Sequence, residues 1–178
     1  FRHCAIDEQA LRNLVEFQIS SGINGIVPCG TTGESATLSE AEHARLIEIV
    51  IEQTAGRVPV VAGVGSNNTA VAIERARHAA HAGADALLVV APWYNKPTQT
   101  GMTAHFTAIA DATDLPLVLY NVPGRTGVTI TPETVVTLAQ HPNIVAIKEA
   151  SGSLDAVSQI VAETGPDFVV LSGDDSLT

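Results

Sequence analysis

The chain has 178 residues, of which 46% are hydrophobic, and this is enough apolar material for the core of one domain. Its formal net charge is −10 and its nine Lys and Arg residues are scattered singly, which excludes a basic surface that neutralises nucleic-acid phosphates. The apolar runs, such as 84–92, are far shorter than the roughly 20 residues that span a bilayer, and no leader is visible. We therefore predict a cytoplasmic protein with neither nucleic acid nor membrane as a partner.

Six short runs rich in β-branched residues predict six strands. Each run is apolar at both odd and even positions, which is typical of strands with two buried faces in a parallel sheet. The starts of successive runs are about 24 to 35 residues apart, which is the spacing of βα units. The predicted strands are 23–29, 58–64, 86–91, 115–120, 144–148 and 168–171.

Helix start and stop signals lie between these runs. Ser39 and Glu42 have the spacing of a capping box. Thr131 is followed by a proline and a glutamate, which indicates an N-cap and a first helical turn. A helix over about 70–82 should end at Gly83. Strict alternation of strand and helix predicts an α/β fold.

Polar clusters follow all six predicted strands. In a (β/α)₈ barrel all strand ends converge on one face, whereas an open doubly wound sheet brings together only those near its switch point. We therefore predict a (β/α)₈ TIM barrel that is incomplete, with 1–178 forming a single partial domain of about strands two to seven with their helices. The clusters lie at 30–34, 65–68, 93–95, 121–126, 148–149 and 172–175.

Lys148 ends the apolar run 144–150, where a core strand normally carries another aliphatic side chain. Desolvation of an amine disfavours its charged form, and the neutral amine is a nucleophile that attacks carbonyl groups. The alternative is a lysine at a strand end whose amine reaches water.

Three further features suggest a site for a small carboxylate. The turn 30–34 offers hydroxyls and backbone N–H groups that can hold an anion, although Gly and Thr turns are common in α/β proteins. Tyr120 could move protons beside an amine, or could be an ordinary tyrosine at the core boundary. Arg125 offers a planar fork for a carboxylate, or a surface ion pair. The aromatic pair 93–94 indicates a lid, a subunit contact or simple packing.

The residues that commonly ligate metals do not form a convincing set. His78 and His81 are three residues apart but lack a matching acid, so we expect solvated surface residues. The acids at 174–175 are expected to be loop carboxylates or caps. Cys4 and Cys29 have no metal-ligand spacing and are too few for a disulfide framework, so both are predicted to be free thiols.

Four motifs occur together and in order, and they make the chain resemble the dihydrodipicolinate synthase (4-hydroxy-tetrahydrodipicolinate synthase) family of the pyruvate-dependent class I aldolase superfamily. The resemblance runs from Phe1 to Thr178 and implies a lyase whose lysine on barrel strand six forms a Schiff base with pyruvate. Condensation with L-aspartate 4-semialdehyde would then give 4-hydroxy-tetrahydrodipicolinate, in the first committed step of lysine and diaminopimelate biosynthesis. The motifs are GTTGES (30–35), YNVPGRT (120–126), IKEASG (147–152) and SGDD (172–175).

The same resemblance assigns catalytic roles. Lys148 would be the Schiff-base lysine and Tyr120 the proton relay, and Thr31 would link Tyr120 to Tyr94, which reaches in from a neighbouring subunit. No cofactor or metal is implied beyond the covalent imine of Lys148 with pyruvate. The family's assembly, a homotetramer built from two tight dimers, is the expected partner state.

It also assigns substrate contacts and leaves alternatives. Thr32 would bind the pyruvate carboxylate, Arg125 the carboxylate of the semialdehyde, and Gly173 would place its carbonyl near the site. One alternative is a sibling aldolase acting on a sugar acid, as in N-acetylneuraminate lyases, although those typically have Ser-Thr in the turn and lack YNVPGRT. The other alternative is a noncatalytic barrel that binds a small carboxylate.

Two departures from the family carry further expectations. Phe1 falls just after the first barrel strand and Thr178 falls before the last βα unit, so we expect the isolated 178-residue polypeptide to be inactive. Lysine-inhibited members usually carry a histidine in place of Glu40 and a glutamate in place of Val71. We therefore expect inhibition by lysine to be weak or absent.

Overall fold

A computed structural model describes residue 1 and residues 5–177 of the chain, so Cys4 lies outside the described residues. Its sheet has five parallel strands in the order β1-β2-β3-β4-β5, so neighbours in space are neighbours in sequence. In the part of the chain that is described, no helix is both long and apolar enough to cross a membrane. The strands are β1 (Val61–Gly63), β2 (Ala86–Val90), β3 (Leu117–Asn121), β4 (Ile144–Glu149) and β5 (Val169–Ser172).

The first predicted strand is the one that the structure corrects. Segment 23–29 runs parallel to β1 but pairs with it through a single bridge, between Ile26 and Val60. The N–H of Ile26 donates to the carbonyl of Pro59 at 2.9 Å. A regular ladder does not continue because Pro28 has no N–H to donate, and Cys29 adopts a left-handed φ of 55°.

Seven helices occur within the described residues. The capping box of Ser39 and Glu42 is present, and Gly83 ends α3 at a φ of 96°, as predicted. Thr131 occupies the predicted N-cap, but its side chain makes no capping hydrogen bond. The helices are α1 (Glu8–Ser20), α2 (Glu40–Thr54), α3 (Thr69–Ala82), α4 (Gln99–Ala110), α5 (Pro123–Thr126), α6 (Pro132–Leu138) and α7 (Leu154–Glu163), with 3₁₀ turns at Ser35–Thr37 and Asp175–Leu177.

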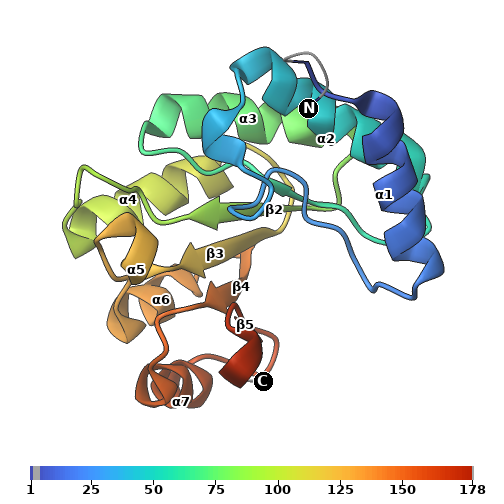
Figure 1. Cartoon of the computed structure of the whole chain (residues 1–178). Helices are drawn as coiled ribbons and strands as arrows, with labels where there is room; N and C mark the ends of the chain where they lie inside the picture. Colours follow the sequence, from blue (N-terminus) through green and yellow to red (C-terminus); the bar gives the residue numbers. More distant parts are fainter. Residues whose placement is uncertain (2–4, 178) are drawn as a thin grey trace.

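The helices from α2 onward, except the short α5, follow one another along the outer side of a curved sheet (Figure 1). A doubly wound sheet would carry helices on both faces, so the arrangement confirms the predicted barrel architecture. Within the described residues the sheet stays open, with β5 at one edge and β1 with segment 23–29 at the other.

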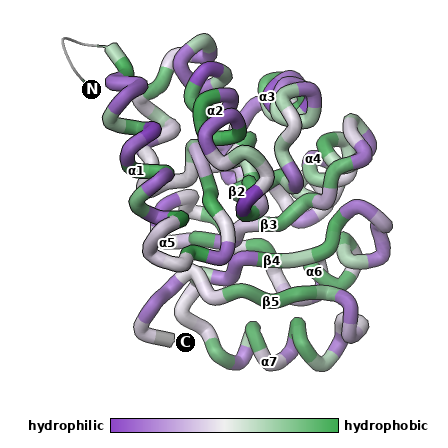
Figure 2. The backbone as a smooth tube through the Cα atoms, turned by 90° about the vertical axis from the view of Figure 1, so that its right-hand side faces the viewer, coloured by the Kyte–Doolittle hydropathy of each residue, from purple (hydrophilic) through white to green (hydrophobic). Residues whose placement is uncertain are grey.

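The two faces of the sheet bury two different clusters. Leu87, Leu117, Leu119 and Ile147 pack outward with the helices in the main core. A smaller inner cluster lies on the opposite face and contains Leu88, Val118, Tyr120, Val122 and Ala146. Successive strand residues alternate between the faces, and β3, β4 and β5 are mostly hydrophobic along their length (Figure 2).

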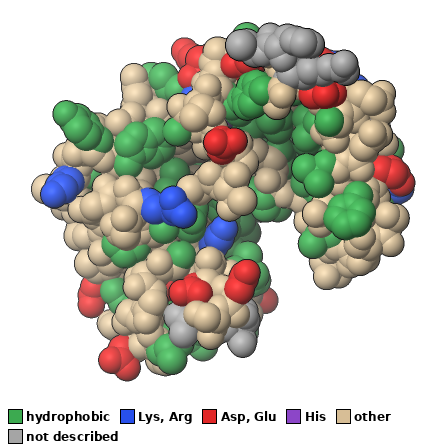
Figure 3. Space-filling view, viewed as in Figure 1, with side chains coloured by type: hydrophobic (Ala, Val, Ile, Leu, Met, Phe, Trp, Pro, Cys, Tyr) green, Lys and Arg blue, Asp and Glu red, His purple; other side chains and the backbone are tan. Residues whose placement is uncertain are grey.

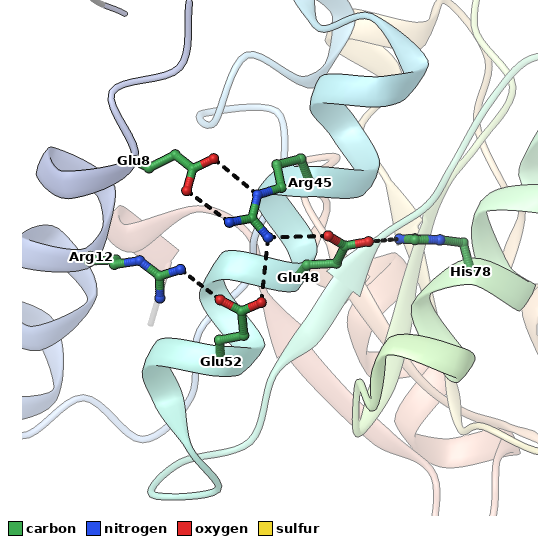
Figure 4. A network of polar contacts seen from close by, with 6 residues as sticks. All are labelled: Glu8, Arg12, Arg45, Glu48, Glu52 and His78. Carbon is green, nitrogen blue, oxygen red and sulfur yellow. Dashed lines mark hydrogen bonds and ion pairs between the residues drawn. The ribbon is translucent and has the colours of Figure 1, made fainter.

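A network of charged side chains joins α1, α2 and α3 (Figure 4). The Arg45 guanidinium donates to both carboxylate oxygens of Glu8, at 3.0 and 2.8 Å, and Arg12 donates to Glu52 at 2.6 Å. His78, expected to be simply solvated, lies 3.4 Å from a carboxylate oxygen in the network. These contacts attach α1 to the rest of the fold; the members are Glu8, Arg12, Arg45, Glu48, Glu52 and His78.

We predict that Arg45→Met loosens α1 at neutral pH but not in acid. Hydrogen bonds from Arg45 and Arg12 lower the pKa values of Glu8 and Glu52 respectively, so their contribution is present above the ordinary carboxyl pKa and is lost as the pH falls through the lowered values. Amide hydrogen exchange of α1 should therefore be faster in the variant than in the parent at pH 7, and the difference should disappear in acid.

The control is Arg77→Met, which removes an exposed arginine of α3 outside the network. Equal exchange of α1 in the parent and in Arg45→Met at pH 7 would contradict the role of the network.

Candidate functional site

Lys148 and Tyr120 are brought together on the inner face of the sheet. They are register partners on β4 and β3, and the Lys148 Nζ lies 4.5 Å from the centroid of the Tyr120 ring. Tyr120 is 6% exposed and Lys148 is partly buried. An ammonium over an aromatic ring is held by the ring's negative face, which favours a fixed position over a side chain that extends into water. The predicted pairing of amine and phenol is therefore present.

Gly173 lies against the same lysine. Its N–H donates to the carbonyl of Glu149 at 2.7 Å, which holds the end of β5 to the end of β4. A Cβ at position 173 would lie 3.1 Å from Lys148 Cε and 2.7 Å from Ala150 Cβ. The structure thus gives this glycine a steric role beside Lys148, in addition to the carbonyl role that was predicted.

The turn at 30–34 provides the amino-terminal wall of the site. The Thr31 carbonyl accepts a hydrogen bond from the N–H of Glu34 at 3.1 Å, and Glu34 has a left-handed φ of 54°. Among the described residues, the N–H groups of Thr31 and Thr32 have no acceptor, so both can bind an anion. Thr31 and Tyr120 line one narrow cavity of about 30 Å³. Thr32 is exposed and lines neither this cavity nor the larger one beside it.

Arg125 and Thr31 line the larger cavity, which has a volume of about 240 Å³. Arg125 is exposed on the short helix α5, which begins at Pro123 and ends before Gly127 at a φ of 72°. Trp93 lies in the wall of both cavities, a position that its place in a loop did not predict. On this side the molecule is hollowed between α1 and the end that carries β5 and α7 (Figure 3).

Tyr94 is not brought to the other predicted residues within the chain. Its side chain is 87% exposed, its φ is 69°, and it lines neither cavity. The neighbouring Asn95 holds the loop by donating to the carbonyl of Asn67 at 3.0 Å. The relay from Tyr120 through Thr31 to Tyr94 therefore stays a prediction that requires a second subunit.

Two buried polar residues beside the site were missed by sequence reasoning. Asn121 and Glu149 are 1% and 4% exposed, and the Asn121 amide donates to both carboxylate oxygens of Glu149, at 3.2 and 2.9 Å. The available signal was the recurrence of a polar residue at the end of two successive apolar strands.

Other predicted polar residues have local roles. The Asp174 carboxylate accepts from the N–H and hydroxyl of Ser176, as expected of a loop cap. Burial raises the pKa of the Cys29 thiol to about 12. Glu40 binds Arg75 at 2.6 Å, and the weak response to lysine expected from Glu40 stays a prediction. Within the described residues, no three His, Cys, Asp or Glu side chains gather as a metal site.

We predict that Gly173→Ala moves Lys148 and destabilises the fold. The new methyl group would meet Ala150 and Lys148 inside ordinary contact distance, and such overpacking costs about 1–3 kcal/mol. The matched control is Gly165→Ala, where a Cβ meets nothing within 4 Å. Urea unfolding should show the loss for position 173 alone, and equal unfolding curves for both variants would contradict the contact.

Comparison with known proteins supplies independent information on this arrangement. A family model described as the dihydrodipicolinate synthetase family matches residues 2–178. The 4-hydroxy-tetrahydrodipicolinate synthases of Geobacter sulfurreducens and Syntrophobacter fumaroxidans are 61% and 57% identical to the chain over 178 residues. The chain is covered completely in both matches, but it spans only 61% of the length of these curated relatives.

Solved structures share the fold. The crystal structure of dihydrodipicolinate synthase from Aquifex aeolicus matches with a TM-score of 0.99 at 47% identity, over all of this chain and 61% of that one. The 4-hydroxy-tetrahydrodipicolinate synthase of Methylacidiphilum fumariolicum SolV matches with a TM-score of 0.98 at 50% identity, over all of this chain and 60% of that one.

Proposed function

Because the chain belongs to the dihydrodipicolinate synthetase family, we propose that the protein carrying it condenses pyruvate with L-aspartate 4-semialdehyde to give 4-hydroxy-tetrahydrodipicolinate. The observation that carries this proposal is the Lys148 Nζ held 4.5 Å from the centre of the Tyr120 ring on the inner face of the sheet. An amine beside a phenol is the pair that imine chemistry needs, one group to attack and one to move protons. The condensation would serve lysine and diaminopimelate biosynthesis.

The proposed reaction begins when the neutral amine of Lys148 attacks the keto carbon of pyruvate. The resulting carbinolamine loses water to give an imine, and the departing hydroxyl takes up a proton that the Tyr120 phenol can deliver. Loss of a proton from the pyruvate methyl group then gives an enamine. The enamine carbon attacks the aldehyde carbon of the second substrate, and the new bond forms as the aldehyde oxygen is protonated.

The two carboxylates of the substrates fit different walls of the site. Thr32 and the two N–H groups that lack an acceptor at 31–32 suit the carboxylate of pyruvate. Arg125 lines the 240 Å³ cavity and suits the carboxylate of the semialdehyde, with the two-pronged geometry that guanidinium offers. Gly173 keeps the space beside Lys148 open.

The proposal includes the wider setting of the protein. We place residues 1–178 in one barrel domain of a cytoplasmic homotetramer, a dimer of dimers that uses no metal and no cofactor. The 87% exposure of the Tyr94 side chain suits a contact in which this residue enters the site of the neighbouring subunit. Thr31 would then connect it to Tyr120.

Lysine trapping tests the proposed imine directly. Lys148 and Lys96 are the two lysines of the chain, so a peptide map distinguishes an adduct on one from an adduct on the other. Treatment of the protein at its natural length with pyruvate and borohydride should attach the reduced pyruvate to Lys148. Lys148→Arg should abolish the adduct and Lys96→Arg should keep it. Binding of pyruvate with no adduct at any residue would favour the noncatalytic carboxylate-binding barrel instead.

Arg125→Gln tests the second carboxylate site. Loss of a charge-assisted hydrogen-bonding pair should raise the KM for aspartate semialdehyde about 10 to 100-fold, with the KM for pyruvate within about threefold of the parent. Arg77→Gln, at an exposed arginine of α3, is the matched control. Turnover of N-acetylneuraminate or keto-deoxy sugar acids, and none of the semialdehyde, would instead indicate the sibling aldolase.

A further inference from the structure

We propose that Asn121 and Glu149 form a buried clamp that positions both substrate sites at once. This inference rests on the proposed function, since it assigns what holds Lys148 and the Arg125 loop in place. Neither residue faces the inner side of the sheet, so they would act as positioning residues.

The Glu149 carboxylate is an enclosed acceptor that receives three hydrogen bonds. Oε1 accepts from the N–H of Ser151 at 2.7 Å and from the Asn121 amide at 3.2 Å, and Oε2 accepts from the same amide at 2.9 Å. With 4% of the residue exposed, these bonds replace those that water would make. A buried polar network satisfied in this way has one favoured arrangement and resists displacement.

Asn121 extends this arrangement to the loop that carries Arg125. Its side-chain carbonyl oxygen accepts from the N–H of Ile130 at 3.0 Å, where the loop 122–130 returns to the fold. Its backbone carbonyl accepts from the N–H of Ala150 at 2.8 Å, immediately after β4. One residue therefore connects the end of β4 with the far end of the Arg125 loop.

The connection to the proposed catalytic amine is through the backbone. Asn121 and Glu149 are register partners, as are Tyr120 and Lys148 one residue earlier on the same strands. Side chains alternate across a strand, so the two pairs point to opposite faces of the sheet and share its backbone. A twist that relaxes a strained pair at positions 121 and 149 would turn Lys148 relative to the Tyr120 ring. Displacement of reacting groups by about 1 Å can lower a rate about a hundredfold.

Exchanging the two functional groups gives a test with its own rescue. Glu149→Gln places a donor against the Asn121 amide, and Asn121→Asp places a carboxylate against Glu149. The double variant N121D/E149Q restores one amide facing one carboxylate, with the charge of the parent. The new carboxylate at position 121 would still accept from the N–H of Ile130, and the new amide at position 149 would still accept from the N–H of Ser151.

The matched control is Asn143→Asp at the opposite end of β4. The Asn143 amide donates to the carbonyls of Ala110 and Thr113, at 3.2 and 3.1 Å, away from the site. This variant should lower the unfolding temperature and leave the rates per folded molecule unchanged. It defines what a merely structural loss looks like.

The readouts are the rate of borohydride trapping at Lys148 and the KM for aspartate semialdehyde, each per folded molecule. We expect each single variant to slow trapping about tenfold and to raise that KM about tenfold, and the double variant to return both to within about threefold of the parent. Unchanged values in Glu149→Gln, or a double variant no better than the singles, would overturn the clamp.

Failure of the clamp is distinguishable from failure of the proposed function. If the parent protein gives no adduct with pyruvate, the proposed function is wrong and the clamp falls with it. If the parent traps at Lys148 and Glu149→Gln traps equally fast, only the clamp is wrong. Should either single variant not fold, Glu149→Asp keeps the carboxylate with a shorter reach, and the same two readouts decide.

Discussion

The structure depends on the alternation of side chains along β3 and β4. Because neighbouring residues point to opposite faces, the chain can place an apolar surface against its helices and polar groups on the inner face with the same short strands. Leu119 and Ile147 pack outward with no exposed surface, and one residue further along each strand Tyr120 and Lys148 meet inside. A slip of one residue in pairing would bring Leu and Ile inward and bury the amine among helices.

The ends of the strands meet a second requirement, which is to bring together loops that are far apart in the sequence. The turn at 30–34 and the Arg125 helix share one cavity wall because both follow parallel segments whose ends lie on the same side of the fold. The hydrogen bonds of Asn121 and Glu149 lie behind this wall. The outward face of the strands, which elsewhere contributes only packing, thus includes polar groups where the loops begin.

Much of this arrangement could be predicted from the sequence because it depends on local patterns. The apolar runs locate the five strands of the sheet, and the glycine and capping signals locate the ends of α2 and α3. Segment 23–29 has the composition of a full strand, but Pro28 and the left-handed Cys29 interrupt its ladder. Lys148 is recognisable because an amine is unusual in an apolar strand. Asn121 and Glu149 escape such reasoning because their importance comes from contact with each other, which periodicity does not report.

The strand order has a consequence for how the chain reaches this structure. Each strand pairs with the next in sequence, so every step of assembly closes a loop of one βα unit, and the entropy cost of each closure stays small. A chain emerging from the ribosome can therefore add units in order, from its amino-terminal helices towards β5. Tyr120 is in place before Lys148 arrives opposite it, and Gly173 follows last. The groups that surround the amine are thus completed by the final described strand, which makes the site a late product of folding.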